Sequence, residues 1–213
     1  MTRLLVPARP ARTEIVVVNS RFIADAAPAF TVEEARAFIQ RIRAEFPDAT
    51  HHVPAYLIGH GSSVIAHCSD AGEPAGTAGR PMLAVLEGSG LGDIVVVVTR
   101  YFGGTRLGTG GLVRAYSDAV RAVLDVLPRA EKVYTHTALL EVPYALYERV
   151  RLLAERQGGE VLAAEFAAEV TLTLCFREED YPAFAATLRE FSRGSLEPLL
   201  VEEHRLALMP LAG

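Results

Sequence analysis

The sequence predicts an α+β chain of two domains, with residues 1–131 in the first and residues 132–213 in the second. In the first, a glycine- and arginine-rich segment stands between a β-branched strand and an amphipathic helix, a common place for ligand contacts. Pro128 and the turn into Glu131-Lys132 mark the boundary. After it, strands and helices follow in the order βαββαβ over about eighty residues, the order of a ferredoxin-like sheet.

Composition favours a globular protein. The chain has 213 residues, half of them hydrophobic, and a net charge of −5. No apolar run approaches the ~18 residues of a membrane span, and the apolar part of the N-terminus is too short for a signal peptide. We therefore expect a cytoplasmic location and no membrane contact. Cys68 and Cys175 lie in different predicted domains, which argues against a disulfide, and two cysteines exclude a Cys-rich metal site.

Charge is unevenly distributed along the chain. Residues 1–130 hold thirteen Arg against twelve Asp and Glu, whereas residues 131–213 hold eight Lys and Arg against fourteen acidic residues. An acidic domain is a poor general partner for nucleic acid. Any phosphate contact is therefore expected in the first domain.

The elements of the first domain follow from local patterns. Residues 13–26 are β-branched around Asn19-Ser20, which indicates a bulged strand or a tight hairpin. Thr31 and Glu34 form a capping box that begins a helix ended by Pro47. The remaining expected elements are strands on both sides of residues 59–61, a helix near 81–88, a strand at 93–99 and a helix at 111–128. In the second domain, strands are expected at 133–143, 160–166, 168–176 and 196–208, and helices at 144–158 and 178–194.

Residues 100–111, RYFGGTRLGTGG, are called here the glycine–arginine segment. Glycines let a backbone approach a ligand closely, and a helix N-terminus offers free N–H groups to an anion. The expected phosphate-binding residues, with Thr109 also as helix cap, are Arg100, Gly103, Gly104, Arg106, Gly108, Thr109, Gly110, Gly111 and Arg114. Neither the Walker A motif nor G-x-G-x-x-G matches. The alternative is a tight structural turn with solvated arginines.

Residues 69–81, SDAGEPAGTAGRP, are called the acidic loop. Its candidate site residues are Asp70, Gly72, Glu73, Gly76, Thr77, Gly79 and Arg80. If the loop faces the glycine–arginine segment, the two form a concave site of mixed charge. Asp70 and Glu73 then have three alternatives: an acid–base pair, caps of backbone amides, or an internal salt bridge to the arginines.

The histidines and aromatic residues give weaker indications of a functional site. His51 and His52 are adjacent on an expected strand and should point to opposite faces, which favours structural roles. Their spacing to other ligands matches no metal site. Tyr101 and Phe102 either stack on bases or belong to the core. We expect no metal, no cofactor and no catalytic residue.

The strings SDAGEPAGTAGRPML and VVVVTRYFGGTRLGTGGLVRAYSDAV, with SRFIA and ATHHVPAYLIG upstream, resemble the IMPACT family over about residues 14–125. Residues 132–213 resemble the small C-terminal domain of its bacterial members. The resemblance implies a first domain like the second domain of small-subunit ribosomal protein five, and a second like the last domain of elongation factor G. Ala71 stands where the family usually has a second aspartate, which weakens a metal site there.

The resemblance also implies a function. Eukaryotic relatives regulate translation by binding a scaffold protein and restraining a starvation-sensing kinase. The first hypothesis is a non-enzymatic, translation-linked regulatory protein whose loops bind RNA, the ribosome or a nucleotide phosphate. One alternative is a hydrolase or transferase acting on a phosphorylated small molecule. The other is an adaptor that binds a protein partner in translational control.

Overall fold

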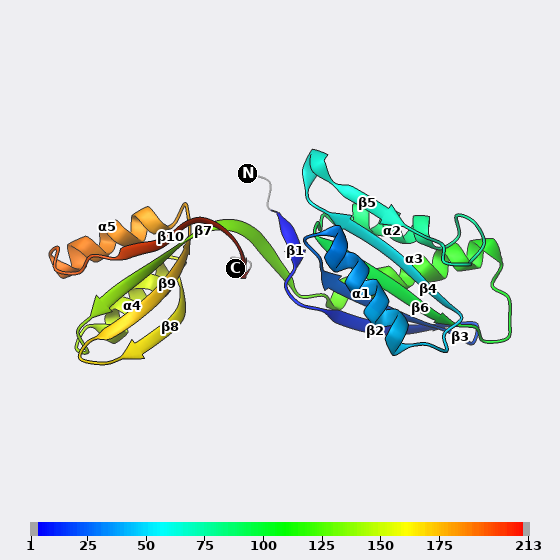
Figure 1. The fold of residues 1–213 in the computed structure, drawn as a ribbon, viewed down its shortest axis with the longest axis horizontal. Helices are drawn as coiled ribbons and strands as arrows, with labels where there is room; N and C mark the ends of the chain where they lie inside the picture. Colours follow the sequence, from blue (N-terminus) through cyan, green and yellow to red (C-terminus); the bar gives the residue numbers. More distant parts are fainter. Residues whose placement is uncertain (1–3, 211–213) are drawn as a thin grey trace. The chain divides into compact units, whose positions relative to one another are not determined.

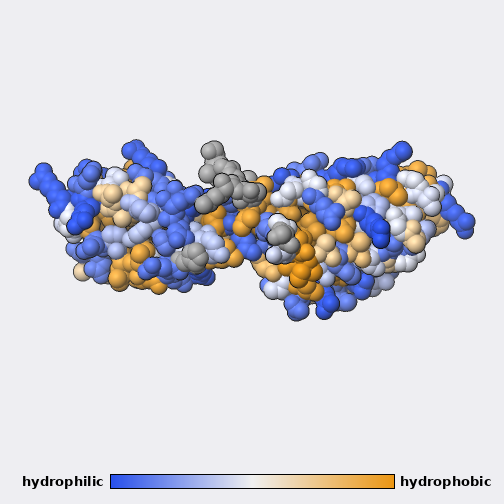
Figure 2. All heavy atoms as spheres, turned by 90° about the horizontal axis from the view of Figure 1, so that it is seen from above, coloured by the Kyte–Doolittle hydropathy of each residue, from blue (hydrophilic) through white to orange (hydrophobic). Residues whose placement is uncertain are grey.

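The computed structural model describes residues 4–210. The chain divides into two compact units, Met1–Glu131 and Lys132–Gly213. Each unit contains its own antiparallel sheet and its own helices (Figure 1). Within the described residues, no helix is long and apolar enough to cross a membrane. The face drawn in Figure 2 is mostly hydrophilic, with hydrophobic residues in separate patches.

The first unit is built around a five-stranded sheet in the order β2-β3-β6-β4-β5. The bounds of its elements are β1 Leu5–Pro7, β2 Ala11–Val17, β3 Ser20–Pro28, α1 Val32–Glu45, β4 His51–Ile58, the 3₁₀ turn η1 Gly61–Ser63, β5 Ile65–Cys68, α2 Gly79–Glu87, β6 Ile94–Tyr101 and α3 Gly108–Val126. Of the two alternatives for residues 13–26, the hairpin is correct: β2 and β3 pair through a turn at Val18 and Asn19. β1 was not predicted, and it pairs with residues 129–131.

Both faces of the central strands β3, β6 and β4 are buried, because helices cover each face, whereas the edge strands β2 and β5 are partly exposed. α1 packs Phe38, Ile39 and Ile42 against one face, which carries Val95 and Val97. α2 and α3 cover the other face (Figure 1). The predicted N-cap of α1 is confirmed, since Thr31 Oγ1 accepts from the Glu34 amide, but the glutamate half of the capping box differs, because Glu34 accepts from the amide of Phe30, one residue before the N-cap. A sheet buried on both sides leaves its loops and strand ends as the place for a site.

The second unit has the predicted βαββαβ order. Its elements are β7 Arg129–Val142, which starts in the first unit, α4 Tyr147–Arg156, β8 Glu160–Phe166, β9 Val170–Arg177, α5 Tyr181–Ser192 and β10 Leu199–Pro210. The sheet runs β10-β7-β9-β8, so the strands of each βαβ unit have another strand between them, as in a split βαβ fold. Its core includes Leu140, Leu172, Phe176, Phe184 and Leu188. The resemblance of the two domains to ribosomal and elongation-factor domains stays a prediction.

The start of α3 differs from the prediction, and this affects the candidate phosphate-binding residues. α3 begins at Gly108 rather than at Gly111, so Gly108, Thr109 and Gly110 form its first turn. The N-cap position belongs to Leu107, and no side chain bonds to the helix end there. The expectation that Thr109 caps the helix is therefore wrong. Glycine's low helix propensity explains the late predicted start.

Candidate functional site

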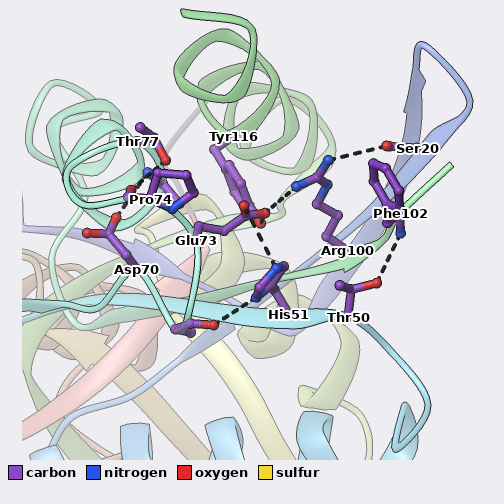
Figure 3. A network of polar contacts seen from close by, with 12 residues as sticks. Ser20, Thr50, His51, Asp70, Glu73, Pro74, Thr77, Arg100, Phe102 and Tyr116 are labelled. Carbon is purple, nitrogen blue, oxygen red and sulfur yellow. Dashed lines mark hydrogen bonds and ion pairs between the residues drawn. The ribbon is translucent and has the colours of Figure 1, made fainter. Parts of the chain in front are cut away.

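The acidic loop and the glycine–arginine segment meet at one end of the first unit (Figure 1). The residue that joins them is Glu73. Its Oε1 accepts from Arg100 Nη1 at 2.6 Å and from the Tyr116 hydroxyl at 2.7 Å (Figure 3). The acidic loop, the end of β6 and α3 are thus bound together by one carboxylate.

This junction is buried. Glu73 is 8% exposed and Arg100 is 5% exposed. The Arg100 guanidinium lies 5.4 Å from the Phe22 ring and 5.6 Å from the Phe102 ring, and its Nε is buried without a hydrogen-bond partner. Burial, together with the bond to Glu73, holds the pKa of the Tyr116 hydroxyl far above its ordinary value, so Tyr116 acts as a donor. Arg100 makes the internal salt bridge, and it leaves the set of candidate phosphate ligands.

His51 and His52 point to opposite faces of β4, as expected for adjacent strand residues. His51 Nδ1 lies 2.9 Å from the Ala71 carbonyl and Nε2 lies 3.8 Å from Glu73 Oε2 (Figure 3). His52 Nε2 lies 2.9 Å from the Phe46 carbonyl at the end of α1. Both imidazoles therefore hold backbone segments in place.

Asp70 binds the backbone of its own loop. Oδ1 accepts from the amides of Ala78 and Gly79, at the start of α2, and Oδ2 accepts from the Gly76 amide. Partial burial alone would raise the pKa of Asp70, but these bonds outweigh burial and hold the pKa below its ordinary value. This is the capping alternative, and it makes Asp70 a poor proton acceptor near neutral pH.

The other candidates of the acidic loop are mostly structural. Thr77 is buried and donates to the Pro74 carbonyl. A side chain at Gly79 would overlap the backbone of Ser69, and one at Gly72 would press on the His51 ring. Gly76 has φ +76° and faces open space. Arg80 is exposed at the start of α2.

Two glycines of the glycine–arginine segment also serve packing. A Cβ at Gly103 would overlap the backbone of Asn19, and the Gly103 amide donates to Ser20 Oγ. A Cβ at Gly111 would lie 3.1 Å from the Leu107 Cβ. The β2–β3 hairpin thus fixes where the segment leaves β6.

The rest of the segment is open. Apart from the adjacent residues and the backbone of α3 itself, no atom lies within 4 Å of a Cβ built on Gly104, Gly108 or Gly110. The first turn of α3 has neither a capping side chain nor an acidic residue. Arg106 and Arg114 are exposed, and neither forms an ion pair with a described residue. The helix N-terminus thus has free N–H groups, with one exposed arginine just before the helix and another one turn after Gly110, and positive charge near free N–H groups attracts anions.

Sequence reasoning missed three residues of the junction. Tyr116 lies within the helix expected at 111–128 and Ser20 within the expected bulge or hairpin, and Thr50, whose Oγ1 accepts from the Phe102 amide, lies in no expected element. A hydroxyl inside an otherwise apolar stripe was the available signal for Tyr116. Within residues 4–210, no group of three His, Cys, Asp or Glu side chains is placed to hold a metal ion.

Comparisons with known proteins find relatives of both domains. Residues 18–124 match the Impact N-terminal domain, and residues 140–195 match a domain of unknown function, DUF1949. IMPACT family member YigZ of Escherichia coli is 41% identical over 204 residues, 95% of this chain and 100% of that protein. An IMPACT family member of Haemophilus influenzae is 41% identical over 203 residues, 95% of this chain and 98% of the other.

Among solved structures, one described as the crystal structure of a hypothetical protein is similar to this chain. It has a TM-score of 0.61 and 40% sequence identity, and the match covers 95% of this chain and 99% of the other. The matches to these relatives therefore extend over both domains of this chain. The chain belongs to the IMPACT family.

Proposed function

We propose that this protein is a non-enzymatic, translation-linked regulator whose first domain binds RNA phosphate groups at the N-terminus of α3. The observation that carries the proposal is the uncapped first turn of α3, where Gly108 and Gly110 face open space. The translational role is supported by family membership, since the family's eukaryotic members are regulators of translation. The phosphate contact follows from the helix end and its charges.

Arg106 and Arg114 supply the positive charge. Arg114 lies one turn after Gly110, and helical side chains lean toward the N-terminus, so its guanidinium extends toward the open amides. Arg106 precedes the helix on the exposed part of the segment. Because neither is paired with a carboxylate, neither has to break an ion pair to bind phosphate.

Phe102 favours RNA over a small phosphorylated molecule. Its ring is 47% exposed, directly before Gly103. An exposed ring beside a phosphate-binding turn is a stacking surface for an unpaired base. Tyr101 is less available, since it is only partly exposed and its hydroxyl donates to Asp48 Oδ1 at 2.9 Å.

The acid–base alternative has less support. Asp70 holds three backbone amides, and Glu73 holds Arg100 and Tyr116 inside the domain. A proton transfer by either group would break the contacts that position its own loop. We therefore propose no reaction at this site.

The test measures binding of a fluorescein-labelled, single-stranded 12-nucleotide RNA by anisotropy at several salt concentrations. Replacing Arg106 and Arg114 with Gln should weaken binding and flatten the slope of log K against log salt by about 1.4, because each lost phosphate contact removes about 0.7. The matched control replaces Arg36 and Arg43, exposed on α1, and changes net charge equally.

Phe102→Leu separates RNA from a bare phosphate ligand. Loss of base stacking should weaken RNA binding about fivefold or more while leaving the salt slope unchanged. ATP, added as a competitor, should displace the RNA only weakly. Equal losses in the α1 control and the site variant, or no RNA binding at low salt, would refute the proposal.

A further inference from the structure

The second unit ends in an open strand. β8 is the outermost strand of its sheet and pairs only with β9 among the described strands (Figure 1). Its outer backbone N–H and C=O groups are therefore available to another chain. A bulge between Val161 and Ala163 divides the pairing with β9 into a short first part, at Glu160 and Val161, and a regular second part over residues 163–166. Proline and lysine, which commonly protect edges, are absent from β8.

Exposed aromatic side chains lie at the end of this edge. Phe166 is 60% exposed and Tyr144 is 56% exposed, and their ring centroids are 6.3 Å apart. Tyr147 approaches Phe166 edge-on at 5.4 Å. The Tyr144 hydroxyl donates to the Ala167 carbonyl at 2.8 Å, which fixes its ring beside the β8–β9 turn. The cluster is therefore an ordered apolar surface that is exposed to water.

Unpaired carboxylates accompany the aromatic cluster. Glu160 and Glu165 lie opposite Cys175 and Thr171 of β9, on the sheet face that the helices do not cover, and Glu169 follows in the turn. None of the three forms an ion pair with a described residue. Residues 132–213 carry eight Lys and Arg against thirteen Asp and Glu. The edge thus has acidic groups on one side and aromatic groups on the other.

These features identify the occupant by its chemistry. Nucleic acid is excluded by like charge. A second copy of β8 would bring two sets of carboxylates to one seam, and like charges across strands are destabilising. We propose that β8 binds an extended basic segment of a partner protein as an added strand. Its Lys or Arg side chains face Glu160 and Glu165, and its apolar side chains, which alternate with them, lie on Phe166 and Tyr144.

The test uses the full chain and a fluorescein-labelled peptide of alternating Arg and Val. Glu160→Gln with Glu165→Gln should weaken peptide binding about fivefold to tenfold, and Phe166→Ser should weaken it by a similar factor. The matched control, Glu190→Gln with Glu197→Gln, removes the same charge from other exposed positions and should leave the affinity unchanged.

Backbone pairing has its own readout. Two peptide versions, N-methylated at odd or at even residues, keep the side chains but block opposite edges of the peptide strand. Strand addition predicts that one version binds and the other does not, and that bound peptide protects β8 amides from hydrogen exchange.

Three results would each overturn the proposal. The first is equal binding of both methylated versions, and the second is equal weakening by the control pair. The third is no binding of the peptide, including the case in which the protein forms a dimer through β8. RNA binding at α3 is independent of all three.

Discussion

The two loops of the first domain are both rich in glycine, but in one loop the polar groups are bonded within the domain and in the other they are open to solvent. In the acidic loop, Asp70 and Glu73 bind nearby amides, Arg100 and Tyr116. In the glycine–arginine segment from Gly104 to Gly111 there is no carboxylate, so its amides and Arg106 have no internal partner of that kind. The same abundance of glycine therefore serves a closed structural loop in one case and an open helix end in the other.

The difference teaches that carboxylates, rather than glycines, decide which loop can hold an anion. A loop that contains acidic side chains satisfies its own donors. A loop without them leaves the donors for water or a ligand. Glu73 acts on both loops, because it bonds within the acidic loop's own junction and also pairs with Arg100, so that Arg100 is not available to a ligand of the open segment.

The largest expected effect is therefore at Glu73. Glu73→Ala leaves the Arg100 charge buried without its partner and should destabilise the first domain by about 3–5 kcal/mol. Urea unfolding followed by circular dichroism measures the loss. Asp118→Ala, which breaks the exposed Arg121–Asp118 pair, is the control and should cost less than about 1 kcal/mol. Equal losses from the two variants would mean that the junction does not hold the loops.

The sequence predicts an element of this fold well when the residues that define it are close together along the chain. Local periodicity predicts α1 and β6, because each is defined by its own apolar residues, such as Phe38, Ile42 and Val97. β1 was missed because its three residues become a strand only by pairing with residues 129–131, far along the chain. A pattern confined to one short segment carries no information about such a partner.

The site shows the same limit. Sequence analysis could name Asp70, Glu73 and Arg100, but it left three alternatives open for the carboxylates. Choosing among them for Glu73 requires the Glu73–Arg100 contact, which joins residues 27 positions apart. The start of α3 was misplaced for a local reason, because three glycines within the GTGG sequence lower helix propensity where tertiary structure nevertheless forms a helical turn.

The next expected effect separates the packed glycines of the segment from the open ones. Gly103→Ala would place a Cβ against the backbone of Asn19 and should destabilise the domain by about 1–3 kcal/mol. Gly110→Ala meets no neighbouring atom and should stabilise α3 by about 0.5–1 kcal/mol. Urea midpoints of the two variants measured side by side check the opposite signs. A loss at both positions would show that the open region is packed as well.

A smaller effect depends on pH and tests the closed loop. The pKa of Asp70 is lowered in the folded protein, so its contribution to stability is complete above the ordinary Asp value and is lost as pH falls through the lower folded pKa. Asp70→Asn should cost about 1–2 kcal/mol at pH 7. When the pH is lowered from 5 to about 3 or below, the free energy of unfolding of this variant should therefore fall less than that of the parent protein.

Urea unfolding at pH 7, 5 and 3 measures the difference, and Asp125→Asn on the exposed face of α3 is the control. That variant should follow the parent protein across the whole range. If Asp70→Asn followed it as well, the amide bonds to Asp70 would contribute nothing to the stability of the closed loop.

The smallest expected effect concerns the hairpin against which Gly103 packs. Val18 has φ +46° and its side chain is 54% exposed, so a β-branched residue occupies the left-handed region without compensating burial. Val18→Asn suits a two-residue hairpin turn with positive φ and should raise the free energy of unfolding by about 1 kcal/mol. Val16→Asn, the same substitution at an exposed position inside β2, should instead lower it slightly, because asparagine is unfavourable in strands. The turn supports the backbone at Asn19 that Gly103 contacts, and it is separate from the open helix end. A more stable hairpin should therefore leave RNA binding at that helix end unchanged. A change in RNA binding would show that the hairpin itself belongs to the RNA-binding surface.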